Sequence, residues 1–517
     1  MPVLPMKQDH VLYPEGIFMN QYCFILWAFI LLVLPSGCSL SPELSASDIR
    51  VEYAASSDTP AIGPNEASPA APSSLIPLSV DPQKALRAPL TLPGVIDITI
   101  ANNPDLQQAL ARISKARALK DLSDAAFWPA LGFYTEYMQG DAPSGYLFKK
   151  IDQRQLPPNS NFNDPGWFEN FESGVSVRMN IFNGGRDYLG NRMAGQDVDI
   201  SNLERHAVVN ELKAQVISAF YDVQASQKFI GIAQASVASV SEQLRIIQVQ
   251  YKGGGALKAD VLTLQVRLAR AKESLLESRN RYRVAKTALA YFMGFDPADE
   301  SVDLKTAARP ADGFMEVPAT FKQDIIYAFE HRPELKKIRK RLIKSRMGLD
   351  VSKTGYLPRI DLMGKYYMDD LHMKYDRDRE NWTAAMMLNW DLFTGFSTRA
   401  RIKKADAVVR EMLAADRKAT LDIAFDVKHA YLNLEASRAR YEVAQSSVES
   451  AEESYRLVTE HYKGGAVTIT RYLEAELDWN RSRIRSTASF YDKIKANAGL
   501  ARAIGMLTDG KPAGPGQ

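Results

Sequence analysis

Hydrophobic residues recur along two long stretches of the chain at spacings that alternate between three and four positions. The seam of the first stretch consists of Val209, Leu212, Val216, Ala219, Val223, Ser226, Ile230, Ala233, Val237, Val240, Leu244, Ile247 and Tyr251. The second seam lies 211 positions later, at Thr420, Ile423, Val427, Ala430, Leu434, Ser437, Tyr441, Ala444, Val448, Ala451, Tyr455, Val458 and Tyr462. This spacing is typical of coiled coils. A helix over residues 187–250 would be roughly 95 Å long at 1.5 Å per residue, far longer than an ordinary globular helix.

Both stretches end in the same glycine-containing motif, which is Tyr251-Lys252-Gly253-Gly254 in the first and Tyr462-Lys463-Gly464-Gly465 in the second. Glycine tolerates the positive φ that reverses the chain after a helix. A returning seam follows the first motif, at Leu257, Val261, Leu264, Leu268, Ala271, Leu275, Ser278, Tyr282, Ala285 and Leu289. It stops near Gly294, which is matched by Gly505 in the second stretch. We therefore predict two long helical hairpins with glycine tips.

Four shorter segments alternate apolar and polar residues, which favours strands. Their apolar positions are Leu131, Phe133 and Tyr137; Val175, Val177, Met179 and Ile181; Ile360, Leu362 and Tyr366; and Met386, Leu388, Trp390 and Leu392. The residues between them are mostly polar, such as Glu136, Arg178, Asp361 and Asn389. One apolar and one polar face over about ten residues is typical of lipid-facing strands of a transmembrane β-barrel. A half-buried hairpin of a soluble protein has the same pattern.

The landmarks of the chain occur twice, which indicates a duplicated unit. Phe182 and Gly184 recur as Phe393 and Gly395, at the offset of 211 positions that also relates the two tips. Pro104 and Pro129 recur as Pro333 and Pro358, at an offset of 229 positions. The first copy therefore contains 18 additional residues (229 − 211) between Pro129 and Phe182. We place them in the polar loop 139–171, which corresponds to the shorter loop 369–381.

Each copy is expected to run helix, strand, strand, helix, helix. A short helix of about 25 residues, opened by a proline in its first turn, precedes the strands, and the long hairpin follows them. We assign the first copy to residues 91–300, the second to residues 301–510, and a disordered tail to residues 511–517.

The N-terminal region has the composition of a targeting signal followed by a flexible tether. The apolar run 23–34 suits the core of a signal peptide and is short for a membrane span. It leads into Leu34-Pro35-Ser36-Gly37-Cys38, which resembles a bacterial lipoprotein cleavage box. We predict a signal peptide at residues 1–37, lipidation of Cys38, and a flexible tether rich in Ser, Pro and Ala at residues 38–90. Simple cleavage and a retained anchor are the alternatives.

Composition and motifs argue against nucleic-acid binding and catalysis. The formal net charge is +3, and no basic run indicates a nucleic-acid partner. Cys23 and Cys38 are the only cysteines, so the body of the chain has neither a disulfide nor a thiolate metal site. The six histidines are scattered without metal-ligand spacing, and no phosphate-binding loop is present. We expect no cofactor and no enzymatic activity.

The order of motifs, present twice over roughly residues 90–507, resembles the TolC-like outer-membrane efflux protein family. The resemblance implies a mainly α fold with a transmembrane β-barrel contribution. Four strands from each of three protomers would form a 12-stranded barrel, continued by a long periplasmic α-helical coiled-coil tube. It also implies a homotrimer in the outer membrane lipid that meets a periplasmic adaptor protein and, through it, an inner-membrane pump or secretion ATPase.

The same resemblance implies roles for individual residues near the tips. Gly253, Gly254, Gly464 and Gly465 would form the periplasmic mouth and contact the adaptor. Arg471 and Glu474 fall at the two positions of the family's acidic constriction, and Arg471 reverses the sign of the first. Tyr462 and Asp260 match two members of the family's closing network, whose arginine is replaced by Val467. The alternative for Arg471 and Glu474 is an exposed intrahelical ion pair worth a few tenths of a kcal/mol.

The leading functional prediction is a passive outer-membrane exit duct of a tripartite efflux pump or a type I secretion system, extending into the periplasm. A lipid-anchored periplasmic coiled-coil adaptor or scaffold is the alternative from another class. The resemblance leaves the cargo open among drugs, metals, siderophores and proteins.

Overall fold

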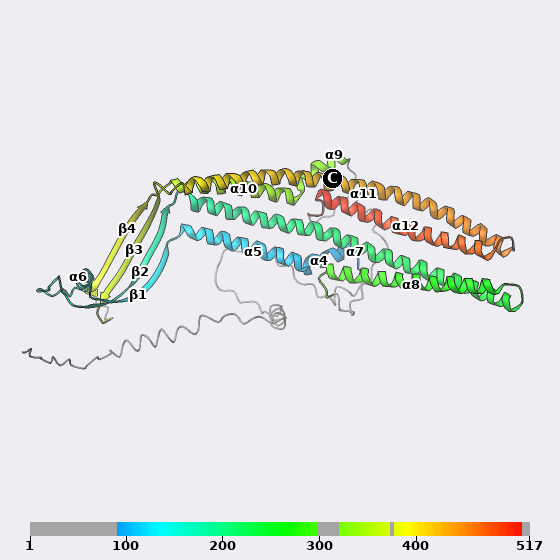
Figure 1. Ribbon diagram of the computed structural model, residues 1–517, viewed down its shortest axis with the longest axis horizontal. Helices are drawn as coiled ribbons and strands as arrows, with labels where there is room; N and C mark the ends of the chain where they lie inside the picture. Colours follow the sequence, from blue (N-terminus) through cyan, green and yellow to red (C-terminus); the bar gives the residue numbers. More distant parts are fainter. Residues whose placement is uncertain (1–89, 297–319, 373–376, 509–517) are drawn as a thin grey trace, which may run out of the picture. The chain divides into compact units, whose positions relative to one another are not determined.

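A computed structural model of the chain describes residues 90–296, 320–372 and 377–508 (Figure 1). The predicted signal peptide, Cys38, nearly all of the tether and the tail at residues 511–517 lie outside the described residues. Among the described helices, none combines the length and the apolar character needed to cross a membrane.

The elements follow the predicted order twice, with additions. The first copy contains α4 (Leu92–Asn102), α5 (Pro104–Asp124), β1 (Ala130–Gly140), α6 (Pro143–Asp152), β2 (Phe168–Phe182), α7 (Arg186–Lys252) and α8 (Lys258–Phe292). The second contains α9 (Phe321–His331), α10 (Pro333–Lys353), β3 (Arg359–Asp370), β4 (Glu380–Asn389), α11 (Ser397–Lys463) and α12 (Ile469–Ile504). Short 3₁₀ turns lie at Ala125–Phe127, Thr354–Tyr356 and Arg377–Arg379.

The long hairpins pack along the seams read from the sequence. α7 and α11 each contain 67 residues, and α8 and α12 return beside them (Figure 1). Every seam residue of α11 is buried or half-buried, and in α7 only Tyr251, at the tip, is exposed. The heptad prediction is therefore confirmed. The larger apolar core lies around the hairpin bases, and a smaller cluster lies toward the tips.

The four strands form one antiparallel sheet in the order β1-β2-β3-β4. Apart from Trp390 and Leu392, which follow the end of β4, the residues predicted to be apolar share one face of the sheet, where Leu131 and Phe133 are 74% and 77% exposed. The other face carries paired polar residues, such as Glu172 opposite Asp369 and Ser176 opposite Lys365. Within the described residues, β1 and β4 each pair with a single neighbouring strand, so the sheet of one chain has two open edges.

The structure contains three helices that the sequence did not predict, α4, α6 and α9, and one strand, β4, is shorter than predicted. The described part of each copy begins not with the helix at the proline but with α4 or α9. The hydroxyl oxygen of Thr91 accepts from Gly94 N at 3.4 Å to cap α4, and Thr320 N donates to the Gln323 side chain to cap α9. α6 forms inside the predicted loop 139–171. β4 ends at Asn389, so Trp390 lies beyond the strand, where its indole nitrogen donates to the Tyr356 carbonyl at 3.0 Å.

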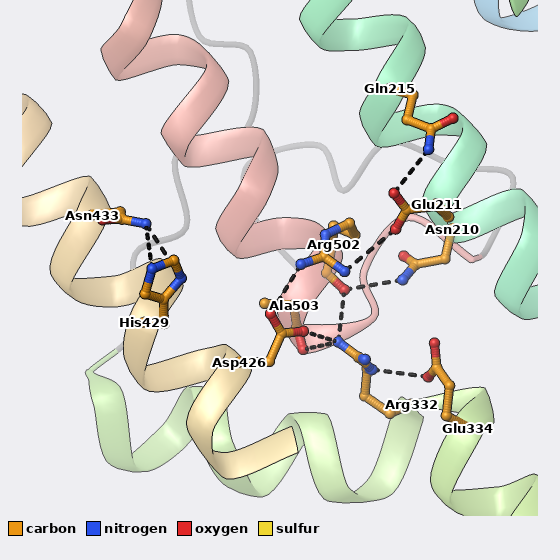
Figure 2. Close-up of polar contacts among 10 residues, drawn as sticks. All are labelled: Asn210, Glu211, Gln215, Arg332, Glu334, Asp426, His429, Asn433, Arg502 and Ala503. Atoms are coloured by element: carbon orange, nitrogen blue, oxygen red, sulfur yellow. Dashed lines mark hydrogen bonds and ion pairs between the residues drawn. The ribbon is translucent and has the colours of Figure 1, made fainter. Parts of the chain in front are cut away.

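Arg332 fixes the base of the second hairpin (Figure 2). It immediately precedes Pro333 at the start of α10. Its Nη1 donates to the Ala503 carbonyl at the end of α12 and to Asp426 on α11, both at 2.8 Å. Its Nε donates to Glu334 at 2.9 Å. One buried guanidinium therefore holds the ends of α10 and α12 against α11.

Asn103 occupies the equivalent position in the first copy. Its Nδ2 donates to the Phe292 carbonyl at the end of α8 at 2.9 Å, and its Oδ1 accepts from Asp105 N to cap α5. Phe292 and Ala503 are themselves 211 positions apart. The two copies thus close the same junction, one with a neutral amide and the other with a charged guanidinium.

Arg502 joins the two copies near this junction (Figure 2). Its guanidinium donates to Asp426 on α11 at 2.9 Å and to Glu211 on α7 at 3.4 Å. Asn210 on α7 donates in turn to the Arg502 carbonyl at 3.0 Å. The bases of the hairpins are consequently cross-linked by polar contacts as well as by apolar packing.

Candidate functional site at the hairpin tips

The two tips have the same backbone geometry. Gly254 and Gly465 have φ values of +78° and +75°, a left-handed conformation that costs roughly 1–2 kcal/mol for residues with a Cβ. Gly253 and Gly464 end their helices with negative φ. The amide after each tip pair donates to the carbonyl five residues back, Gly255 to Gln250 and Ala466 to His461, both at 2.8 Å. The sequence predicted these tips and their glycines; their contact with an adaptor stays a prediction.

Asp260 has a local structural role as well as a position near the second hairpin. Its Oδ2 accepts from Leu257 N at 3.3 Å and caps the start of α8, where a negative charge favours the helix terminus. Burial, and after it the charge of Asp260, raises the pKa of the Tyr462 phenol. The structure thus brings these two predicted residues of different hairpins close together.

Arg471 and Glu474 lie in the first turns of α12 and form an ion pair with each other. The Arg471 Nη1 and Glu474 Oε2 atoms are 3.6 Å apart, and the side chains are 58% and 52% exposed. Such exposed pairs contribute little to stability. The geometry therefore contains the intrahelical pair that the sequence offered as the alternative. It leaves both side chains open to solvent beside the tip.

An aromatic cluster that the sequence analysis did not identify lies behind the second tip. Tyr462 stacks on Tyr472 with a centroid distance of 5.0 Å, and Tyr455 stacks on Trp479 at 4.9 Å. The hydroxyls of Tyr455 and Tyr472 are hydrogen-bonded at 2.9 Å. Tyr455 and Tyr462 are seam positions of α11, and Tyr472 and Trp479 are one heptad apart on α12. These heptad positions were the feature of the sequence from which the cluster could have been predicted.

The same region of α12 contacts the first hairpin. Gln243 on α7 donates to the Tyr472 hydroxyl at 3.3 Å, and Ser239 on α7 hydrogen-bonds to both Tyr472 and Glu476. Glu476 is only 3% exposed. Burial raises the pKa of its carboxyl, while Ser239 and the charge of Arg267 on α8 act in the opposite direction. A buried carboxyl therefore lies where the two hairpins meet.

Several characterised bacterial proteins are similar to this chain over most of its length. Protein CyaE of Bordetella pertussis is 24% identical over 429 residues, which cover 82% of this chain and 86% of that protein. The pyoverdine export outer membrane protein OpmQ of Pseudomonas aeruginosa is 22% identical, with coverage of 82% and 86%. The alkaline protease secretion protein AprF of the same species is 23% identical, with coverage of 80% and 85%.

Solved structures have the same fold. The CmeC outer membrane channel of Campylobacter jejuni superimposes with a TM-score of 0.71 at 16% identity, covering 86% of this chain and 94% of that chain. The outer-membrane channel OprN gives a TM-score of 0.69 at 18% identity, covering 86% and 98%. The likeness confirms the predicted fold class, in which long helical hairpins continue into the strands of an outer-membrane channel.

The family description "Outer membrane efflux protein" matches the chain twice, over residues 95–294 and 327–506. Each match contains a strand pair and the long hairpin that follows it. The chain belongs to the outer membrane efflux protein family.

Proposed function

We propose that this protein is the outer-membrane exit duct of a tripartite efflux pump or a type I secretion system. Membership of the family places it in the outer membrane, extending into the periplasm. Relatives named for pyoverdine export and for alkaline protease secretion support an export role without choosing a cargo. The observation that carries the proposal is a sheet with an exposed apolar face, continuous with helical hairpins whose first helices contain 67 residues each.

The open edges of the sheet support a homotrimer. Unpaired backbone groups at a sheet edge are very costly in lipid, so strands span a membrane only as closed barrels. Four strands cannot close a barrel, whereas three chains supply the twelve strands that can. In this assembly β4 of one protomer pairs with β1 of the next, and the polar faces line the pore.

The tips supply the contact with the other components of the export system. Gly253, Gly254, Gly464 and Gly465 lie at the periplasmic mouth and meet an adaptor protein, which links the duct to an inner-membrane pump or secretion ATPase. The energy for transport comes from that partner, because the duct itself is a passive conduit and not an enzyme.

Glu474 and Arg471 form the charged ring at the narrow mouth, and Tyr462 and Asp260 hold the two hairpins near one another when it is closed. A ring of charge at a constriction selects ions by sign. Because Arg471 is paired with Glu474 within the helix, each protomer adds a neutral pair to the ring and not two negative charges.

Fractionation and conductance test the exit-duct proposal. We expect the protein to remain in outer membranes after carbonate extraction, to migrate as a heat-modifiable trimer, and to form channels in planar bilayers. A protein released by carbonate, with no conductance after purification, would instead be the lipid-anchored periplasmic scaffold.

The ring is tested separately by Glu474→Ala. We expect altered single-channel conductance and altered block by cations, because three charges are removed from the mouth. Glu453→Ala is the matched control, since Glu453 forms an equally exposed intrahelical pair with Arg456 on α11. Currents through the Glu474→Ala channel that match those of the control would remove Glu474 from the ring.

A further inference from the structure

The additional residues of the first copy contain a helix that is attached to the sheet by a buried charge. Lys149 on α6 lies within 2.6 Å of Glu172 on β2 and within 3.0 Å of Asp369 on β3. The side chains are 16%, 12% and 0% exposed, in that order. Figure 1 shows α6 beside the end of the sheet that is far from the long helices.

The register of the strands identifies the face that α6 covers. Glu172 and Asp369 are directly opposite each other on β2 and β3. Side chains alternate between faces along a strand, so Val175 and Tyr366, three residues from these acids, point to the other, exposed apolar face. α6 therefore lies on the polar face, which is the face toward the pore if the apolar face contacts lipid.

The contact between α6 and the sheet is closely packed. Gln153, just after α6, is fully buried and donates to Asn170 Oδ1 at 2.8 Å and to the Glu169 carbonyl at 2.9 Å. A Cβ on Gly145 would lie 2.7 Å from the ring of Phe168, which is 3% exposed. The helix is thus seated on its strand by both polar and apolar contacts.

Lys149 also has an electrostatic role that the amides around it cannot replace. Asp369 accepts from Asn170 at 2.6 Å and from Asn381 at 3.2 Å, and Glu172 accepts from the Tyr134 hydroxyl at 2.7 Å. These donors are neutral, so Lys149 is the cation in direct contact with both buried acids, and the charge of Lys365 also acts on Glu172. Removing one partner of a buried ion group leaves an uncompensated charge, which favours release of α6 into water.

The opposite side of α6 is apolar and uncovered. Phe148 and Ile151 are 64% and 43% exposed, and their spacing of three places them on one face of the helix. In a barrel lined by the polar face of the sheet, this apolar face points away from the wall.

We infer that α6 is a built-in constriction at the extracellular exit of the duct, held against the wall by Lys149. The inference rests on the proposed function, because it requires the polar face to line a trimeric pore. Three copies of α6 then bring Phe148 and Ile151 toward the axis, where an apolar ring opposes the passage of hydrated ions. The surfaces that face this ring are the same helices of the two neighbouring copies.

Conductance of two variants in planar bilayers tests the constriction. We expect Lys149→Met to raise the single-channel conductance roughly twofold or more, because the helix leaves the pore. Lys150→Met is the matched control, since among the described residues the Lys150 ammonium bonds only within its own segment, to Gln153 at 3.2 Å, and we expect the parent conductance. If Lys149→Met does not assemble, Phe148→Ser combined with Ile151→Ser leaves the ion group intact, and we expect it too to raise conductance.

Thiol labelling locates the apolar face directly. A charged thiol reagent added to the extracellular side is expected to reduce the current through Phe148→Cys channels. Phe133→Cys channels should be unchanged, because a thiol that faces lipid is out of reach of a charged reagent. If the parent protein conducts but neither the α6 variants nor labelling at residue 148 changes the current, the constriction is wrong and the duct stands. If the parent protein forms no channel, the proposed function itself fails.

Discussion

Glu476 is the buried carboxyl through which pH acts on the contact between the hairpins. It lies among Tyr472 on its own helix, Ser239 on α7 and Arg267 on α8. Because burial raises its pKa in the folded protein, the folded state binds the proton more tightly than the unfolded state. The contribution of Glu476 to stability is therefore greatest below the unfolded pKa of about 4.3 and declines as the pH rises through the higher folded value.

Glu476→Gln is expected to remove this pH dependence. The thermal midpoint of the variant should rise relative to that of the parent between pH 4 and pH 8, because the cost of ionising the buried carboxyl is present only in the parent, and it should lie above the parent near pH 7. Glu474→Gln is the control, because Glu474 is exposed two positions earlier on the same helix, and its profile should follow the parent. A parent-like slope in Glu476→Gln would show that this carboxyl stays ionised at no cost.

At the scale of residues, the sequence predicts what local geometry determines. The glycines at the tips were identified because positive φ is a local requirement. Glu476 was not identified, because its surroundings include Ser239 on α7 and Arg267 on α8, each more than 200 positions earlier in the chain. Arg471 and Glu474 illustrate the difference. Their spacing of three predicted the local ion pair, but it does not determine where the pair lies relative to the pore.

At the scale of elements, Arg332 and Asn103 show how one junction is built in two ways. Both side chains donate to the last turn of a returning helix. Arg332 also forms ion pairs with Glu334 and Asp426. The junction of the second copy is therefore stabilised by a charged side chain, whereas that of the first is stabilised by an amide that also caps a helix.

Arg332→Met is expected to destabilise the hairpin base by roughly 1–3 kcal/mol, discounted from a fully buried pair because its acidic partners are partly exposed. The thermal midpoint of the purified protein measures the effect. Arg456→Met is the control, since Arg456 forms only exposed ion pairs on α11, and we expect a midpoint close to that of the parent. Equal midpoints for the two variants would contradict the role of Arg332.

The elements that periodicity predicted are the ones whose burial is regular over many turns. α7, α8, α11 and α12 and the four strands were all expected from their patterns. α4 and α9 contain only eleven residues each, so neither has a seam long enough to stand out in the sequence. The capping residues Thr91 and Thr320 were the local signals for them. α6 was read as part of a loop because it contains only ten residues, begins with Pro143, Ser144 and Gly145, and makes its contacts with distant strands.

At the scale of the whole molecule, the two faces of the sheet determine where it can reside. Phe133 on the apolar face and Glu136 on the polar face belong to the same strand and are both exposed in the single chain. Lipid would cover the first, and water in the pore would surround the second.

Phe133→Lys is expected to impair assembly into the outer membrane, because a lysine facing lipid costs about 2–4 kcal/mol near the bilayer midplane. Glu136→Lys places the same side chain on the opposite face and is expected to be tolerated. The yield of heat-modifiable trimer in outer-membrane fractions compares the two. Equal yields would contradict the assignment of the apolar face to lipid.

The equal lengths of α7 and α11 restrict how such a duct can change in evolution. Each contains 67 residues. Seven residues added to one of these helices alone would extend its tip about 10 Å past the other tip. The two tips would then no longer present an even surface to a docking partner. A change in helix length that fits the duct to a wider or narrower periplasm must therefore be made in whole heptads and in both copies together. The two halves of the gene are constrained to the same length by the compartment that the duct crosses.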